Sequence, residues 1–219
     1  MKNNFLVFLF LTAFAFASNA QTKPAFGVYY APSFTSRITQ ANSDLNWLKK
    51  EWDKFESGSI GYSFGAFAER TLSTKLSLRV GAGFSSFGER VDSLSDLGID
   101  KYKTDYRFIE VPLVASYYFG ENKYRRPYLS AGYTLNYFLN KRISYSMVGS
   151  SREETTVLRS DVNAISHAVR IAVGVDFVLD KKWSVKTEIF ANQFVSSLTN
   201  DGIRRLPFAA GVSVQLRKK

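Results

Sequence analysis

Apolar side chains recur at every second position along most of this chain, and the alternating segments are long. In residues 108–119 the apolar series runs from Ile109 to Phe119, whereas the positions between them include Glu110 and Ser116. Successive side chains of a strand point to opposite faces, so this pattern predicts a β-strand with one apolar face. Similar patterns occur in eight segments, near residues 24–34, 57–70, 75–88, 104–119, 127–141, 163–180, 183–198 and 205–217. The chain is therefore predicted to be all-β.

The lengths of the segments and of the links between them indicate a membrane barrel. Several segments exceed the usual globular strand of about 5 to 6 residues and match the roughly 9 to 11 that cross a bilayer at a tilt. Short links near Ser73, Asn122 and residues 180–182 alternate with long links over residues 35–56, 89–103 and 142–162. Short turns at one end, long loops at the other and an even strand count are typical of outer-membrane proteins. We expect an eight-stranded antiparallel up-and-down transmembrane β-barrel.

Small residues on the second face of the strands indicate which face points inward. The glycines of this face are Gly61, Gly65, Gly81, Gly83, Gly132, Gly174 and Gly211. The narrow interior of an eight-stranded barrel is filled by side chains and leaves little room near the strands. We therefore expect small residues inside and large apolar residues outside, against lipid. Aromatic girdles are expected at the two interfaces, formed by Tyr117, Phe119 and Trp183 near the short turns and by Phe84, Tyr106 and Tyr137 nearer the long loops.

Charged residues also occupy the predicted inward positions. They are Glu69, Arg79, Glu110, Arg170, Asp176, Lys186 and Glu188. Unpaired buried charges are costly, so we predict a structural network of ion pairs in a filled lumen rather than a water-filled pore. A three-residue turn centred on Lys181 would place Asp176 opposite Lys186. The alternative, a carboxylate pair for acid and base catalysis, lacks a nucleophile and a substrate cleft.

The residues that usually carry catalysis or bind metals are scarce. The chain has no cysteine, which excludes a thiol enzyme and disulfides, and His167 is the only histidine, which excludes a multi-histidine metal site. His167 shares the parity of Ile165 and Val169, so it is expected to face outward, away from the interior carboxylates. Gly81-Ala82-Gly83 lies inside a strand with no helix after it and does not fit a phosphate-binding loop. We predict a protein that is not an enzyme and needs no cofactor or metal.

The first twenty residues have the features of a secretory signal peptide. Lys2 precedes an uncharged apolar run over residues 5–17, and Ser18-Asn19-Ala20 offers small residues before a cut. This run is too short to cross a bilayer, which needs roughly 20 helical residues. We expect residues 1–20 to be a signal peptide, residues 21–219 to form the barrel domain, and the protein to reside in the cell outer membrane.

The net charge of +10 at pH 7 raises the question of an anionic partner. Basic residues predicted near the short turns are Lys23, Lys75, Lys123, Arg125, Arg126, Lys181, Lys182, Arg217, Lys218 and Lys219, against Glu121 and Asp180. This rim could contact anionic headgroups or could simply be solvated, and the sequence does not separate the two. No nucleic-acid partner is expected, because the charge is not interleaved with exposed stacking aromatics in a groove.

The first long loop contains one helical pattern. Leu45, Leu48, Trp52 and Phe55 fall on one helix face after a potential cap at Ser43. We expect a short helix in the first external loop, acting either as a lid on the barrel mouth or as a contact face for a partner.

Two strand motifs resemble a known family. Arg107-Phe108-Ile109-Glu110-Val111-Pro112-Leu113 leads into Tyr117-Tyr118-Phe119-Gly120, and Arg126-Pro127-Tyr128-Leu129-Ser130-Ala131-Gly132 follows. These segments are similar to the PorT-like outer-membrane β-barrel proteins of Bacteroidota. The resemblance implies a barrel in the outer-membrane bilayer, without catalytic residues, and a namesake linked to protein secretion implies an envelope or secretion partner. The expected function is a non-enzymatic structural or interaction role in secretion or envelope integrity; the alternatives are a barrel enzyme acting on lipid or peptide, and a narrow channel.

Overall fold

The computed structural model describes residues 23–41, 56–94, 99–120, 122, 124–147, 153–158, 162–198 and 203–218. The strands are β1 (Ala25–Ala41), β2 (Glu56–Thr71), β3 (Leu76–Leu94), β4 (Ile99–Tyr118), β5 (Arg125–Met147), β6 (Glu153–Leu158), β7 (Ile165–Val178), β8 (Trp183–Phe194) and β9 (Ile203–Lys218). Within these ranges no helix is both long enough and apolar enough to cross a membrane.

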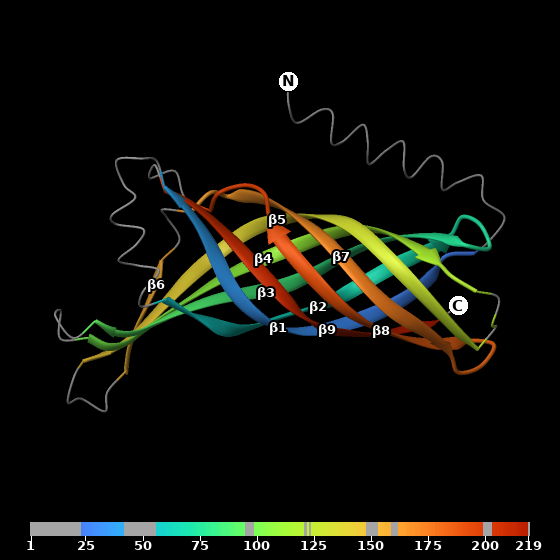
Figure 1. Cartoon of the computed structure of the whole chain (residues 1–219), viewed down its shortest axis with the longest axis horizontal. Coiled ribbons are helices and arrows are strands. Elements are labelled where there is room, and N and C mark those ends of the chain that lie inside the picture. The colour runs from blue at the N-terminus through green and yellow to red at the C-terminus, as the bar shows by residue number, and fades with distance from the viewer. Residues whose placement is uncertain are drawn as a thin grey trace, which may run out of the picture.

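Eight of these strands close into an antiparallel barrel, which Figure 1 shows as an elongated cylinder of tilted strands. The ladder runs β1-β2-β3-β4-β5-β7-β8-β9, and the pairing of β1 with β9 closes it, as in Tyr29 opposite Gln215. The short strand β6 pairs with β5, from Lys141 opposite Leu158 to Ser146 opposite Glu153, and with no other strand among the described residues. The predicted all-β, eight-stranded up-and-down barrel is confirmed, because closure gives every barrel strand two neighbours.

Several strands extend further at the long-loop end than their patterns predict. β3 and β4 stay paired as far as Leu94 opposite Ile99, and β5 continues to Met147 with β6 beside it. Most residues of the two predicted links, 89–103 and 142–162, therefore belong to paired strands. Alternation marks a strand only where one face is apolar, so it cannot detect a ladder whose two faces are both polar. The predicted loop helix, with Leu45, Leu48, Trp52 and Phe55, lies outside the described residues.

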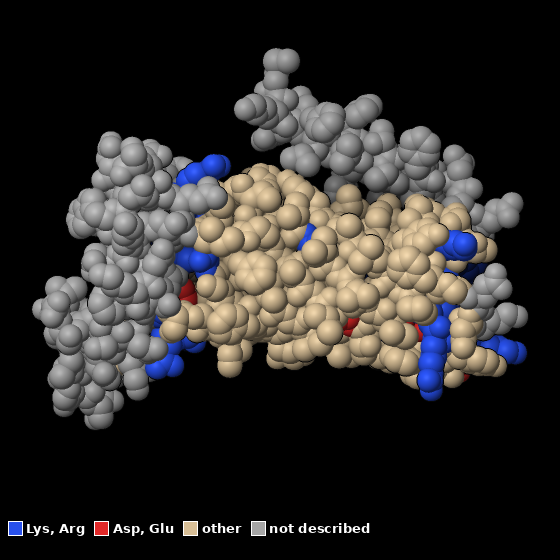
Figure 2. Space-filling view, viewed as in Figure 1, with Lys and Arg blue, Asp and Glu red and all other residues tan. Residues whose placement is uncertain are grey.

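The outer wall of the barrel is apolar. Along β7, Val169, Ile171 and Val173 are 43%, 63% and 57% exposed, whereas Ala168 and Ala172, which have the opposite parity, are buried. Figure 2 shows this surface as a broad, mostly uncharged belt, with basic side chains gathered towards its two ends. Such a wide exposed apolar band is stable only against lipid.

The predicted position of one girdle residue is wrong. Tyr106 is buried at 4% exposure, because it shares the inward parity of Phe108 and Glu110 on β4. Near the short turns, Tyr117 and Phe119 are exposed and pack edge to face with ring centroids 5.1 Å apart. This end of the barrel thus has exposed aromatic rings at the expected level.

Candidate functional site: the filled lumen

An ion cluster fills the lumen near the short-turn end and has Glu69 of β2 at its centre. Lys186 of β8 donates from Nζ to both carboxylate oxygens of Glu69, at 2.6 and 2.8 Å. Arg217 of β9 donates from Nη1 to Glu69 and from Nη2 to Asp176 of β7, the second contact at 2.7 Å. Glu69, Lys186 and Asp176 are at most 2% exposed. Two cations and two anions balance, so the cluster encloses no net charge.

The sequence-based register of β7 and β8 is observed, since Asp176 lies opposite Lys186 and Gly174 opposite Glu188. The side chains of Asp176 and Lys186 also make contacts beyond that ladder. Lys186 bonds Glu69, which is 117 positions away in the sequence, and Asp176 is reached by Arg217. Parity therefore identifies which charges are enclosed, whereas closure of the barrel decides which of them meet.

Arg217 corrects the predicted basic rim. It is 6% exposed and bound inside the lumen, because its odd parity on β9 matches that of Ser213 and Gln215, which are also buried. Arg126 covers this mouth, with its guanidinium 4.2 Å from the ring centroid of Tyr118 and Nη2 donating to the carbonyl of Thr74 at 2.6 Å. The rim residues that remain exposed in the described part are Lys23, Lys75, Arg125, Lys181, Lys182 and Lys218.

A second cluster occupies the middle of the lumen around Glu188 of β8. Arg170 of β7 donates to Glu188 at 2.7 Å, Arg79 of β3 lies 3.8 Å from the same oxygen, and the Tyr128 hydroxyl donates to the other oxygen at 2.9 Å. Arg79 also donates to the amide oxygen of Gln215. Side chains from five strands, β3, β5, β7, β8 and β9, therefore meet in this cluster.

Glu110 of β4 lies in the same layer and binds a tyrosine from the opposite wall. The Tyr29 hydroxyl donates to Glu110 at 2.6 Å. Glycines make room for this ring: a Cβ on Gly83 would lie 2.1 Å from the Tyr29 oxygen, and one on Gly65 would lie 2.8 Å from its ring. Gly65 and Gly83 are thus the sites where the polar Tyr29 side chain approaches the wall.

The space left between these groups is small. A cavity lined by Tyr29, Glu110, Arg170, Glu188 and Asn192, among others, offers about 20 Å³ to the centre of a water molecule. That is room for about one water. This cavity is therefore far too small for a substrate.

An aromatic plug closes the lumen towards the long loops. Phe87 packs on Phe194 and Phe108 with centroids 4.8 and 5.9 Å apart, and Phe108 also packs on Phe194 and Phe138 at 5.6 and 5.8 Å. All four rings are at most 7% exposed. Their mainly edge-on arrangement is a favourable one for aromatic pairs, so they form a compact apolar layer.

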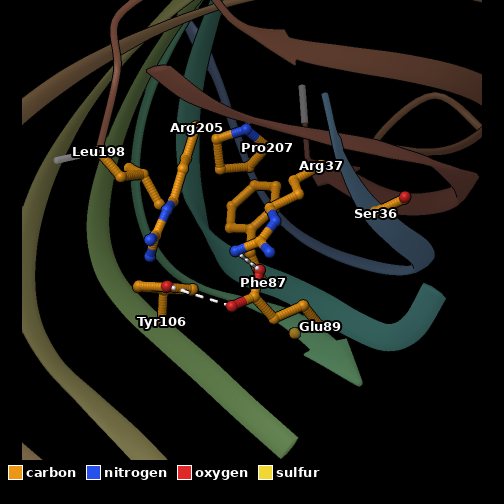
Figure 3. Close-up of a pocket in the computed structure, with 9 residues that line it drawn as sticks. Ser36, Arg37, Phe87, Glu89, Tyr106, Leu198, Arg205 and Pro207 are labelled. Atoms are coloured by element: carbon orange, nitrogen blue, oxygen red, sulfur yellow. Dashed lines mark hydrogen bonds and ion pairs between the residues drawn. The ribbon is translucent and has the colours of Figure 1, made fainter. Parts of the chain in front are cut away.

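Figure 3 shows a small pocket above this plug. Arg37 of β1 pairs with Glu89 of β3 at 2.8 Å, and the Tyr106 hydroxyl donates to Glu89 at 3.3 Å. Arg205, Leu198 and Pro207 line the other side. Arg37, Glu89 and Arg217 are interior charges that the sequence reading missed, although their odd parity on β1, β3 and β9 was a usable signal.

The structure brings all seven sequence-predicted interior charges into the lumen, and it separates His167 from them. His167 lies on the outer face, where its Nδ1 is hydrogen bonded to the Tyr133 hydroxyl and its backbone amide donates to Ser196 Oγ at 2.7 Å. No cluster of three or more histidine, cysteine or acidic residues suited to a metal occurs in the part of the chain that the structure describes.

A closed antiparallel barrel with an apolar outer wall and a packed polar interior defines a transmembrane β-barrel of the outer-membrane class. The chain belongs to the outer membrane protein beta-barrel domain family, whose model matches residues 16–200. It is an outer-membrane protein, and its apolar belt lies in the lipid bilayer.

Solved structures with a similar fold share little sequence with this chain. Neisserial surface protein A has 14% identity and a TM-score of 0.47 over 88% of this chain and 97% of that one. OprG from Pseudomonas aeruginosa has 12% identity and a TM-score of 0.45, covering 88% and 94%. The outer membrane protease OmpT from Escherichia coli has 7% identity and a TM-score of 0.41, covering 89% and 96%. No curated protein sequence matches the chain.

Proposed function

We propose that this protein is a non-enzymatic barrel with a structural or interaction role in the outer membrane, serving protein secretion or envelope integrity. The observation that carries the proposal is the filled lumen: two ion clusters and an aromatic plug occupy it in succession. A lumen packed in this way supports anchoring of the protein rather than transport through it. The functional surface is therefore expected at the exposed ends of the barrel.

The strands that extend past the apolar belt are the proposed contact region. β5 and β6 form a hairpin arm at the long-loop end, where Figure 1 shows β6 beyond the barrel wall. Val157 on this arm is 52% exposed. Membership of the PorT-like group of Bacteroidota, and export through a signal peptide at residues 1–20, are parts of the same proposal and are supported by the motifs quoted above.

Loss and restoration of envelope function test the proposed role. Deletion of the gene is expected to impair secretion or raise permeability of the envelope, and the wild-type gene is expected to restore it. A variant in which residues 143–157 are replaced by a two-residue turn should insert into the membrane and fail to restore it, because the arm is removed and the barrel is kept. Full restoration by this variant would exclude the arm as the contact region, and restoration lost on His167→Ala alone would favour the enzyme.

Conductance distinguishes the proposal from a narrow channel. Protein reconstituted in planar bilayers is expected to give no defined current steps, because ion pairs and rings fill the lumen. Reproducible single-channel steps from the wild-type protein would contradict the proposal and favour the channel.

A further inference from the structure

The outer face of β3, β4 and β5 changes from apolar to basic within a few residues towards the long-loop end. Phe84, Ile109 and Tyr137 stand opposite one another on the three strands and close the apolar belt there. Two residues further along β4, about 7 Å by strand geometry, comes Arg107. The belt therefore borders directly on charged side chains.

These charged side chains form one continuous group, which we name the external basic band: Arg90, Lys103, Arg107 and Arg142. Arg90 lies opposite Lys103, and Arg142 lies opposite Asp105, so all of them share the outward face of the ladder. Lys103 pairs with Asp105 at 3.3 Å and remains 46% exposed. Among the side chains that the structure describes at this end on the outward face of these three strands, four are basic and one, Asp105, is acidic, and Arg90 makes a further interaction of its own.

The band covers three adjacent strands, and Arg204 of β9 is a separate exposed cation towards the same end. On β1 and β2, the outward residues towards the same end include Phe34, Ile38 and Ile60, which are 57%, 48% and 80% exposed. A charge that served solubility alone would have no reason to gather on three adjacent strands. A local excess of this kind fits a local acidic ligand.

The ligand must also match the apolar wall that adjoins the band. An aromatic cluster lies beside it, since the ring of Phe84 is 5.6 Å from that of Phe64 and 6.2 Å from that of Tyr62. Exposed aromatic rings lie in the apolar belt, and the cations lie next to them towards the long-loop end. This arrangement fits a molecule with acyl chains at one end and an acidic group at the other. Short turns of such barrels face the periplasm, which places the band at the level of the outer-leaflet headgroups.

We propose that the external basic band is a binding site for an anionic lipid of the outer leaflet. Its acidic headgroup lies against Arg90, Lys103 and Arg142, and its acyl chains follow the wall at Phe84 and Ile109. The proposal rests on the outer-membrane location alone and is independent of the proposed role in secretion or envelope integrity.

Lipid binding to the folded full-length chain in detergent tests the proposal. The probes are a bis-phosphorylated lipid A, the same lipid with its phosphates removed, and phosphatidylethanolamine, with retention read by native mass spectrometry. The wild-type protein should bind the phosphorylated lipid at least about tenfold more tightly than the triple variant Arg90→Gln/Lys103→Gln/Arg142→Gln, because each basic group near an anionic headgroup adds to binding. The triple variant should not distinguish the three lipids.

Two further variants keep the outcome decisive. Arg204→Gln removes an exposed cation from β9, which lies four strands away from β4 around the barrel in either direction, and should bind as the wild type does. The charge-conserving variant Arg90→Lys/Lys103→Arg/Arg142→Lys should also retain binding, and heat-modified gel mobility shows whether each variant is folded. Equal retention of all three lipids by the wild-type protein, or an equal loss in Arg204→Gln, overturns the proposal. Full displacement of the lipid by soluble heparin would also overturn it, because the band would then recognise a polyanion without acyl chains.

Discussion

Lys186 shows how a single side chain of the lumen can decide stability. Lys186 is 1% exposed, and its ammonium group donates hydrogen bonds to both oxygens of Glu69. Replacing it with methionine keeps most of the volume and removes the charge, leaving Glu69 with Arg217 and the Tyr118 hydroxyl as hydrogen-bond partners. We expect Lys186→Met to lower the free energy of unfolding by about 3 kcal/mol or more, because a buried charge loses a partner.

Urea unfolding of the protein in lipid vesicles, followed by tryptophan fluorescence, measures this effect. Lys182→Met is the matched control, since Lys182 is exposed at the adjacent turn and its loss should cost no more than about 0.5 kcal/mol. The double variant Glu69→Gln/Lys186→Met should recover part of the loss. Equal stabilities of the two single variants would show that the Glu69 cluster does not stabilise the barrel.

Substitution of Gly83 tests how tightly the lumen is packed at a single position. A Cβ at this position would lie 2.1 Å from the Tyr29 hydroxyl and 2.5 Å from the carbonyl of Phe64. Gly83→Val should displace Tyr29 from Glu110 and destabilise the barrel by about 1 to 3 kcal/mol through overpacking. Ala82→Val on the outward face of the same strand should be nearly neutral in the same unfolding measurement. A neutral Gly83→Val would mean that the lumen has more room than this packing allows.

At the scale of the strand, β7 allows the lipid-facing wall to be tested at two depths. Ile171 in the strand and Leu179 just after it are both 63% exposed. An arginine at the bilayer midplane of a barrel costs about 2 to 4 kcal/mol, and one near an interface costs about 0 to 1. Ile171→Arg should therefore be clearly more destabilising than Leu179→Arg in unfolding from vesicles. Equal costs would place Ile171 in water.

The strands also show how far the sequence determines the fold. Alternation located all eight barrel strands, because each has one face in lipid and one in the lumen. It failed at the long-loop ends of β3, β4 and β5 and missed β6, where both faces are polar and only backbone pairing holds the ladder. Tyr106 was wrongly assigned to an interfacial girdle because its ring chemistry was given more weight than its parity, which matches the inner wall.

The lumen was predictable in content and less so in connectivity. The positions of Glu69 and Lys186 on inward faces followed from parity, but their contact joins β2 to β8 across the interior. Which walls face each other depends on closure and stagger of the barrel, and a local pattern contains neither. Arg217 was misplaced for a related reason: nearness to a short turn was given more weight than its alternation with Gln215.

At the scale of the whole molecule, polar contacts tie opposite walls of the closed sheet together. Glu69 is reached from β8 and β9, and Tyr29 of β1 reaches Glu110 of β4. Lipid therefore surrounds the outer surface of the barrel, and packed side chains fill its interior. Side chains are thus sorted between acyl chains outside and a filled lumen inside.

Accessibility of single spin labels along β7 tests this sorting of side chains most directly. The chain contains no cysteine, so Ile171→Cys, Ala172→Cys and Val173→Cys each give one unique labelling site. In lipid vesicles, labels at 171 and 173 should collide with oxygen dissolved in the bilayer, and the label at 172 should be shielded from both oxygen and a water-soluble nickel chelate. Access of the nickel chelate to 171 and 173, or to 172, would contradict the account, because the first would place the outer wall in water and the second would open the lumen.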